Sequence, residues 1–373
     1  MKPGKKIELF SKRILSSLIK SVFKEEIRKP KPPYNKILFL RFDVLGDMIV
    51  SLPVLRACRN SLPSSRIDII CSYKNQSVIE NSGFVNNTYV TTQDIVKNIL
   101  LSIRLRKEKY DLIVNLVTRP SLTYGILTQI IGPKAYRVAG EQEKYEYFYT
   151  HNVALPPKRA IHMTQRLMLL CSFLTEENSL TYRQPWVKFG NEVVEKSSQL
   201  YKKVCQTIDP GKSKLKVAAI NLTSGLERRN WPIEKYIEFL KISSEKHNEK
   251  VDGWVIFTNP SKPNDSKMVE NLVSNKKVIA LPIVNDFKVL FEFLHHLYFL
   301  VTPDTSILHA ASATGTPVLA MIIGENKIVW TPVGNINEVV FSEDPFSLND
   351  LPLTDVLKGM ERLFLKLENL NQQ

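Results

Sequence analysis

Residues 301–317 have the sequence VTPDTSILHAASATGTP, and this stretch decides the fold class that we predict. The apolar run over residues 297–301 predicts a buried strand, which we expect Pro303 to end. Polar residues that cap helices come next, and the small apolar residues after them predict a short helix. Gly315 is a typical helix end, and residues 318–323 predict a second apolar strand. The stretch therefore predicts a strand, a sharp turn, a helix of small residues and a further strand.

The start of this predicted helix is a candidate anion site. Asp304, Thr305 and Ser306 are capping residues, and the first turn of a helix carries free backbone N–H groups that favour a phosphate. The same residues also fit an ordinary capped turn between a strand and a helix, with no ligand. His309 lies one turn further on. We interpret it as a packed residue that steadies the phosphate loop, with proton donation as the alternative.

The composition bounds the class of protein. The chain has 373 residues, of which 43% are hydrophobic, enough for two domains of about 150 residues each. Its net charge of +14 predicts an anionic partner such as a nucleic acid, a membrane surface or a phosphorylated substrate. The four cysteines have no C-x-x-C spacing, which indicates reduced thiols and not a disulfide framework or a zinc site. The sequence predicts neither a transmembrane helix nor a secretory signal.

The first 33 residues differ from the rest of the chain. Apolar residues recur at three- and four-residue spacing among lysines and arginines, and prolines at positions 30, 32 and 33 end the pattern. Such a basic amphipathic helix is typical of segments that lie on an anionic membrane surface. Packing against the protein's own surface is the alternative. Because this segment accounts for much of the charge and lacks alternating aromatic and basic residues, we expect no nucleic-acid partner.

Short apolar runs typical of strands alternate with helical patterns in two successive sets. The first set has predicted strands at residues 37–40, 67–71, 89–92 and 112–116. The second set has them at residues 217–221, 254–258, 278–280, 297–301 and 318–323. Such alternation predicts parallel sheets with helices on both faces. We therefore expect an α/β fold of two doubly wound, Rossmann-like domains, with ligands in the cleft outside the carboxyl ends of the strands.

The same patterns divide the chain into four predicted parts. These are a basic helix and proline-rich linker over 1–33, an N-terminal domain over 34–185, a C-terminal domain over 186–345 and a closing segment over 346–373. Residues 184–186 are a plausible hinge between the domains, and residues 353–370 predict the closing helix.

The loop after the first predicted strand offers a carboxylate. Residues 41–47 predict a turn, and residues 48–60 predict the helix that follows it. Gly46 and Asp47 lie at the carboxyl end of the sheet, so Asp47 is expected to face the cleft; capping the helix is its alternative role. Arg41 could either face the cleft or cap the strand. The loop has neither G-x-G-x-x-G nor G-x-x-x-x-G-K-[ST], so a dehydrogenase or a P-loop kinase is disfavoured.

The loop after the first strand of the second set offers cations. Arg228 and Arg229 lie in this loop, at the same end of the predicted sheet as the helix start at 304–306. A guanidinium there could bind a phosphate held by that helix, and Thr223 and Ser224 could add hydroxyl donors. A solvated basic loop is the alternative interpretation.

Five segments in order resemble the heptosyltransferase family, glycosyltransferase family 9, which has the GT-B fold. They are LRFDVLGDMIVSLP at 40–53, YDLIVNL at 110–116, HMTQRLMLL at 162–170, RNWP at 229–232 and PDTSILHAA at 303–311. The resemblance covers roughly residues 36–340. It implies transfer of a sugar from a nucleotide donor, typically ADP-heptose, to the inner core of lipopolysaccharide or a similar lipid-anchored glycan. It also implies inversion at the anomeric carbon without a metal.

The resemblance also implies roles for individual residues. Asp47 matches the general base, Arg229 stands where the family usually has a lysine that contacts the diphosphate, and Asp265 is the best match for the acidic residue that holds the ribose. Ser306 replaces a glycine of the family, so a hydroxyl is gained where the backbone was freer. The donor-binding and phosphate-binding residues that we predict are Gly46, Thr223, Ser224, Arg229, Asp304, Thr305, Ser306 and His309.

Together, these patterns predict a glycosyltransferase that lies on the inner face of the cytoplasmic membrane and needs no cofactor. No Asp-x-Asp motif is present, so arginine and helix amides must neutralise the departing diphosphate. One alternative is another GT-B enzyme, such as a transferase that uses a UDP-sugar or a nucleotide-sugar epimerase. Another is a non-catalytic, membrane-bound protein that binds a nucleotide sugar and has no need of a base at position 47.

Overall fold

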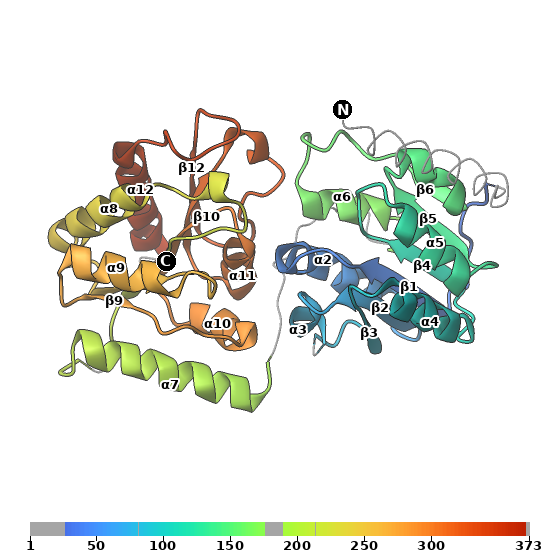
Figure 1. Cartoon of the computed structure of the whole chain (residues 1–373), viewed down its shortest axis with the longest axis horizontal. Helices are drawn as coiled ribbons and strands as arrows, with labels where there is room; N and C mark the ends of the chain where they lie inside the picture. Colours follow the sequence, from blue (N-terminus) through green and yellow to red (C-terminus); the bar gives the residue numbers. More distant parts are fainter. Residues whose placement is uncertain (1–26, 81, 176–188, 213, 371–373) are drawn as a thin grey trace, which may run out of the picture.

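The computed structural model describes residues 27–80, 82–175, 189–212 and 214–370. Within these residues the chain forms two six-stranded sheets, one in each half of the molecule (Figure 1). All paired strands run parallel, so the predicted α/β fold with two doubly wound sheets is confirmed. Most of the predicted N-terminal helix and the predicted hinge at 184–186 lie outside the described residues. The domain boundaries remain a prediction.

The N-terminal half has the strand order β3-β2-β1-β4-β5-β6. Its strands are β1 (Lys36–Arg41), β2 (Arg66–Ser72), β3 (Asn87–Thr91), β4 (Leu112–Asn115), β5 (Tyr136–Gly140) and β6 (His151–Val153). Its helices are α2 (Leu45–Ser61), α3 (Gln76–Ile79), α4 (Ile95–Arg106), α5 (Leu122–Ile131) and α6 (Met163–Leu170), with a 3-10 turn η1 (Glu143–Phe148). Alternate residues of β1 face opposite ways, so Phe39 packs with α2 and α6 while Leu40 packs with α4 and α5.

The C-terminal half has the strand order β12-β11-β10-β7-β8-β9. Its strands are β7 (Val217–Asn221), β8 (Gly253–Phe257), β9 (Val278–Ala280), β10 (Phe299–Pro303), β11 (Val318–Ile322) and β12 (Asn337–Phe341). Its helices are α7 (Asn191–Ile208), α8 (Ile233–Lys246), α9 (Pro263–Val273), α10 (Phe287–Leu294), α11 (Ser306–Thr314) and α12 (Leu353–Leu370), with 3-10 turns η2 (Glu227–Arg229) and η3 (Gly324–Asn326).

Two local predictions about the site differ from the structure. Helix α2 begins at Leu45 and not at Met48, so Gly46 and Asp47 lie in its first turn and not in a loop. Strand β10 ends at Pro303, as expected, but it includes the proline and so extends two residues beyond the predicted end at Val301. The proline is tolerated because the ladder to β7 ends at Val301, so no bond to β7 needs its missing N–H.

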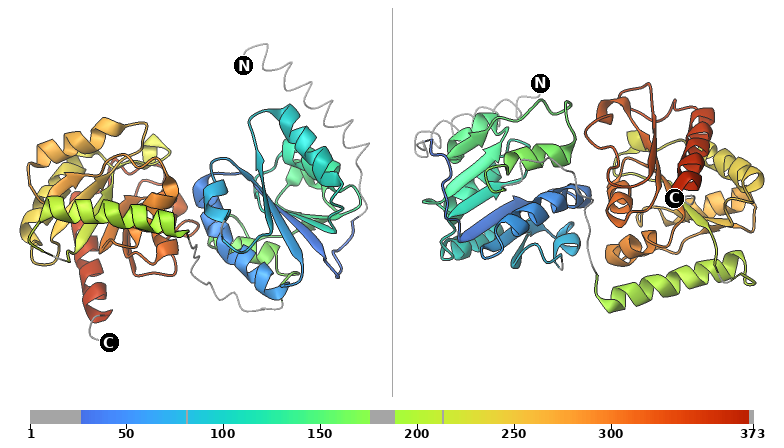
Figure 2. Two further views of the ribbon diagram at one scale, coloured as in Figure 1. Left: turned by 90° about the horizontal axis from the view of Figure 1, so that it is seen from below. Right: turned by 180° about the vertical axis from the view of Figure 1, so that it is seen from behind.

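The two halves meet through helices from opposite sides. Helix α2 of the N-terminal half packs against α11 of the C-terminal half, and α3 packs against α10 (Figures 1 and 2). Buried apolar side chains of α2, α6, α10 and α11 form one continuous cluster across this contact. The contact brings together the carboxyl ends of β1 and β10, where the candidate residues lie.

Two further sequence predictions concern the whole chain. Cys58, Cys71 and Cys171 are buried, Cys205 is partly buried, and all four are free thiols, as the spacing predicts. No helix among the described residues is long and apolar enough to cross a membrane.

Candidate active site

The site begins where two helix starts face each other. Helix α2 follows β1 and helix α11 follows β10, and both strands lie inside their sheets. A Cβ atom added to Gly46 would lie 3.0 Å from Cδ2 of His309 and 3.5 Å from Cα of Ser306. The glycine therefore allows a close approach of the two helices, and it places Asp47 beside the start of α11.

Arg41 lies beneath Asp47 and is almost fully buried. Its Nε donates to the backbone carbonyl of Asp47 at 3.0 Å, and its Nη2 lies 3.4 Å from Oδ1 of the same residue. Its Nη1 donates to the carbonyl of Leu116 at 2.7 Å and to Asp43 Oδ2 at 3.2 Å. Arg41 thus neither lines an open cleft nor simply caps β1. It ties the first turn of α2 to the end of β4.

Asp47 combines partial burial with a nearby cation. Its side chain is 20% exposed, so one edge of the carboxylate can reach a substrate. Burial raises the pKa of Asp47 above the ordinary value for aspartate, and the charge of Arg41 opposes this rise. A carboxylate with a raised pKa is a stronger base than an exposed one.

Asp43 is a second carboxylate next to Asp47, but its surroundings differ. It is paired with Arg41 at 3.2 Å and with Arg119 at 2.9 Å, and its side chain is only 7% exposed. Asp43 is therefore committed to ion pairs, whereas Asp47 has one long contact to Arg41 and an open edge.

On the opposite wall, Arg229 is held at the start of α11 by a buried carboxylate. Its Nη1 lies 3.1 Å from Oδ2 of Asp304, which also accepts a hydrogen bond from Asn326 Nδ2 at 2.5 Å. Burial raises the pKa of Asp304, and Arg229 and Asn326 oppose the rise. The buried Nε of Arg229 has no hydrogen-bond partner among the described residues. The guanidinium thus has an unused donor beside the helix start.

The start of α11 is capped as predicted. The hydroxyl of Thr305 accepts hydrogen bonds from the amides of Ile307 at 3.1 Å and Leu308 at 3.4 Å. Asn221, at the end of β7, donates to the hydroxyl of Thr305 at 3.4 Å and fixes it. Ser306 is the first helical residue. Two of the N–H groups available to an anion are thus already engaged by the cap.

His309 is packed between the walls. It is 6% exposed, its ring centroid lies 5.6 Å from that of Trp330, and its Nε2 lies 3.9 Å from Oδ1 of Asp304. Burial, together with the nearby charge of Arg229, lowers the pKa of His309 to about 4. The ring is therefore neutral near pH 7, which fits the packed residue that we predicted better than a proton donor.

The other predicted donor-binding residues lie at the same edge of the second sheet. The hydroxyl of Thr223 accepts from the amide of Asn259 at 2.8 Å, which joins the loops after β7 and β8. Ser224 donates to the carbonyl of Leu226 at 2.5 Å within its own turn. Asp265 lies in the first turn of α9, after β8, and is partly buried. All three lie at the carboxyl end of their strands.

Sequence reasoning missed a second contact between the halves. The amide of Met163 donates to the carbonyl of Val329 at 3.1 Å, and His162 Nε2 lies 3.2 Å from the carbonyl of Thr331. The same segment after β11 supplies Asn326 and Trp330 to the site. Its sequence, GENKIVW at 324–330, has no phosphate or metal motif, and only its lone tryptophan could have drawn attention to it.

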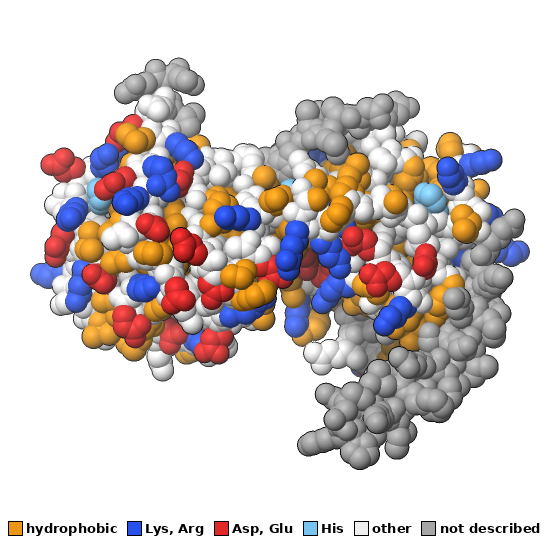
Figure 3. Space-filling model, turned by 90° about the horizontal axis from the view of Figure 1, so that it is seen from above, with side chains coloured by type: hydrophobic (Ala, Val, Ile, Leu, Met, Phe, Trp, Pro, Cys, Tyr) orange, Lys and Arg blue, Asp and Glu red, His pale blue; other side chains and the backbone are white. Residues whose placement is uncertain are grey.

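The surface around the meeting of the halves is rich in both signs of charge. Figure 3 shows basic and acidic side chains side by side where the halves meet.

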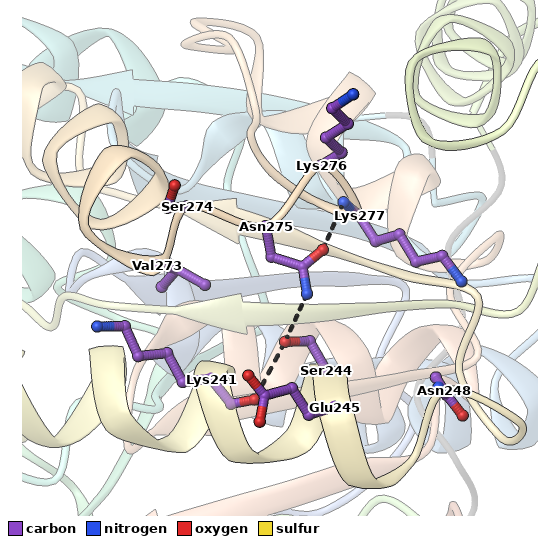
Figure 4. A pocket seen from close by; sticks show the side chains of 9 residues that line it. All are labelled: Lys241, Ser244, Glu245, Asn248, Val273, Ser274, Asn275, Lys276 and Lys277. Atoms are coloured by element: carbon purple, nitrogen blue, oxygen red, sulfur yellow. Dashed lines mark hydrogen bonds between the residues drawn. The ribbon is translucent and has the colours of Figure 1, made fainter.

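A separate pocket of about 600 Å³ lies between α8 and the turn that follows α9, and its polar lining includes Lys241, Glu245 and Lys277 (Figure 4). The end of α8 and the start of β9 place it at the amino edge of the sheet, away from Arg229. No group of three or more metal-ligating side chains occurs within the described residues.

Comparison with known proteins now identifies the family. The model of glycosyltransferase family 9 (heptosyltransferase) matches residues 100–355, more than half of the chain. The chain belongs to glycosyltransferase family 9. It is therefore a glycosyltransferase, and the predicted resemblance is confirmed. The matched residues include Arg229 and α11 but not Asp47, which lies ahead of them.

Individual relatives of this family 9 protein are distant but match along most of its length. Lipopolysaccharide heptosyltransferase 3 of Escherichia coli K12 is 20% identical over 343 residues, which covers 85% of this chain and 95% of the relative. A family 9 glycosyl transferase from Veillonella parvula has a TM-score of 0.73 at 17% identity, with 92% of this chain and 99% of that chain covered. The E. coli ADP-heptose lps heptosyltransferase II has a TM-score of 0.68 at 16% identity, with 89% and 99% covered. These structures confirm the GT-B fold.

Proposed function

We propose that this family 9 enzyme transfers heptose from ADP-heptose to a lipopolysaccharide core or a similar lipid-anchored glycan, with inversion. The observation that carries the proposal is that Gly46, the residue before Asp47, lies against His309 and Ser306 of α11, while Asp304 just before that helix pairs with Arg229. Relatives named lipopolysaccharide heptosyltransferase support the sugar and the acceptor. A structural neighbour named as E. coli heptosyltransferase WaaC with ADP supports the nucleotide.

In the proposed reaction, Asp47 is the general base. Its carboxylate takes the proton of the acceptor hydroxyl as that oxygen attacks the anomeric carbon. The bond from the anomeric carbon to the diphosphate breaks on the opposite face, and its electron pair leaves with the diphosphate. Attack from the face opposite the leaving group inverts the configuration. Asp47 and the diphosphate site lie on opposite walls, as this geometry requires.

Arg229 and the start of α11 receive the charge that develops on the diphosphate. The unused Nε of Arg229 is a charged donor, and a helix start favours negative charge. We propose that Asp304 acts by holding Arg229 in place, and that Ser306 offers its amide and hydroxyl. Asp265 is the proposed partner of the ribose. In this scheme no metal or cofactor is required.

Arg41 is a positioning residue in this proposal. Its bonds to the backbone and carboxylate of Asp47 fix the base, and its bond to Leu116 anchors both to the sheet. It contacts no reacting atom, because it lies almost fully buried beneath α2.

The location of the enzyme completes the proposal. We propose that residues 1–33 lie on the inner face of the cytoplasmic membrane, where a lipid-anchored acceptor is presented. The predicted parts over 34–185 and 186–345 then supply the acceptor and donor sides of the site.

A donor screen tests this function. We expect ADP-heptose to raise the melting temperature of the protein more than GDP- or UDP-sugars at equal concentration, because a ligand that binds the native state stabilises it. The anomeric configuration of the product, read by NMR, tests inversion. A larger shift with a UDP-sugar would favour the alternative GT-B enzyme. Donor binding without turnover on any lipid-anchored glycan would favour the non-catalytic scaffold.

A further inference from the structure

Helix α4 exposes an apolar stripe to solvent. Val96 is 59% exposed, Leu100 is 60% exposed and Ile103 is 50% exposed. Their spacing of four and three residues places them on one side of the helix. Ile95, at 50% exposure, extends the stripe to the first turn. A continuous apolar stripe of this kind marks an interaction surface, whereas single exposed apolar residues do not.

The fold does not use this stripe, because α4 already has a buried face. Ser102 and Leu105 are buried, and Leu105 packs with Leu38 and Leu40 of β1 and with Ile131 of α5. The exposed stripe points the other way. Helix α4 lies on the outside of the N-terminal half (Figure 1).

Cations that have no ion-pair partner among the described residues flank the stripe. The side chains of Lys97, Arg104, Arg106 and Lys107 are all exposed. The two acidic residues nearest in sequence are engaged elsewhere. Asp94 caps the helix by accepting from the amides of Val96 and Lys97, and Glu108 pairs with Arg66 at 2.8 Å. The outward face of α4 is therefore apolar along its centre and positive at its edges.

We propose that this outward face of α4 docks on an anionic phospholipid surface. Apolar side chains can enter the headgroup region while lysines and arginines meet the lipid phosphates, so both parts of the face are used. A second copy of the chain suits the face less well. A symmetric contact through α4 would bring the cations of both copies together without acidic partners.

The position of α4 relates this surface to the catalytic edge. Helix α4 begins at Ile95, after a three-residue turn that follows Thr91, the last residue of β3, so its first turn lies at the carboxyl edge of the sheet. Asp47 lies at the same edge, in the first turn after β1. Docking along α4 thus keeps this edge near the bilayer. This one step rests on the proposed function, because only a lipid-anchored acceptor gives the orientation a purpose.

Helix α9 supplies a matched control surface. Met268 is 42% exposed and Leu272 is 52% exposed, four residues apart, as on α4. Here, however, the neighbouring Lys267 is paired with Glu270 at 2.7 Å. Within α9 itself, the surface is thus exposed and apolar, and the helix's one lysine is paired.

Vesicle co-sedimentation of the full chain tests the proposal. The vesicles contain phosphatidylcholine with about one third phosphatidylglycerol. We expect Leu100→Asp with Ile103→Asp to lower the vesicle-bound fraction about fivefold or more, because two charges replace apolar contacts. Met268→Asp with Leu272→Asp is expected to leave the bound fraction unchanged. Lys97→Gln with Arg104→Gln, which spares the apolar stripe, is expected to weaken binding to these vesicles and not to pure phosphatidylcholine.

Two outcomes would overturn the proposal. One is unchanged binding by the α4 variants when their thermal melts match the parent. The other is a change in oligomeric state on gel filtration, which would make the face a contact between copies. If the variant with the two aspartates does not fold, the variant with the two glutamines tests the proposal by itself.

Transfer to a water-soluble acceptor should be equal in all variants. If the parent chain itself shows no transfer to this acceptor, the result counts against the proposed function and not against lipid docking.

Discussion

The starts of α2 and α11 meet where the two halves are in contact, but they differ in chemistry. Each follows an inner strand of its sheet, and the two pack against each other. At α2 the N-cap, Val44, offers no side-chain bond, and the first turn contains Asp47. At α11 the N-cap is Thr305, the first turn contains no acid, and a cation is held nearby. One helix start thus presents a carboxylate, and the other presents a capped first turn beside a cation.

The difference between the two helix starts comes from the burial and the neighbours of their side chains, and not from the helix itself. A helix N-terminus lowers the pKa of a nearby carboxylate. Burial nevertheless raises the pKa of Asp47 in the first turn of α2.

Replacing Asp47, the proposed base, should lower the rate of transfer without weakening nucleotide binding. We expect Asp47→Asn to lower the transfer rate by about 10²–10⁴-fold, because proton removal from the acceptor is lost. Binding of ADP, measured by calorimetry, should be nearly unchanged. The matched control is Asp43→Asn, which removes the neighbouring carboxylate on the same arginine and should cost much less. Equal loss of transfer and ADP binding in the Asp47 variant would make Asp47 structural.

Removing the cation of Arg229 should weaken nucleotide binding. We expect Arg229→Ala to weaken ADP binding by about 1.5–3 kcal/mol, the value of a hydrogen bond to a charged group. Arg228→Ala is the control, because that side chain is 43% exposed and lies 3.6 Å from Glu325. Calorimetric titration of ADP against both variants measures the difference. Unchanged affinity in the Arg229 variant would remove this residue from the site.

Two buried histidines near the contact should make stability fall in acid. Burial lowers the pKa of His162 and His309 to about 4, below the unfolded value. Their contribution is therefore present above about pH 6.5 and is lost as the pH falls toward 4. Between pH 7 and pH 5 we expect each histidine to cost about 2 kcal/mol, measured by urea unfolding. His162→Asn with His309→Asn should flatten this dependence, and an equally steep profile would contradict the prediction.

A methyl group between the two helix starts should test how closely they must approach. The Cβ of Gly46→Ala would lie 3.0 Å from His309, so α2 and α11 must separate slightly. We expect transfer to fall about tenfold, because small misplacements of reacting groups are costly. Gly46→Ala with His309→Ala should recover part of the loss. Gly190→Ala, where nothing lies within 4 Å of the new Cβ, is the control. Full activity of the Gly46 variant would show that the contact is loose.

The sequence predicted the parts of the site that depend on local pattern. The Thr305 cap, the helix after it and the strands around it follow from residue types within a few positions. The start of α2 was placed three residues late, because Val44 and Leu45 give no capping signal and the first turn contains a glycine. Local pattern also located the carboxylate after the first strand of one half and the cation after the first strand of the other, although Asp47 lies in a helix and not in a loop.

The contacts that fix these groups could not be predicted, because they join distant parts of the chain. Arg41 bonds to Leu116, 75 positions away, and Asn326 reaches Asp304 from 22 positions away. Such pairs arise only when parallel strands set their neighbours side by side. Whether Arg41 faces the cleft or caps the strand was therefore undecided until the fold was known.

The Thr305 cap has a consequence for how the donor is held. Its hydroxyl already occupies the amides of Ile307 and Leu308 before a ligand arrives. A diphosphate that reaches those amides exchanges one set of hydrogen bonds for another, so it gains little from them. In the proposed site, attraction between the guanidinium of Arg229 and the diphosphate would then supply most of the affinity. Such attraction weakens as ionic strength rises, so we expect the affinity for the donor to fall as the salt concentration increases.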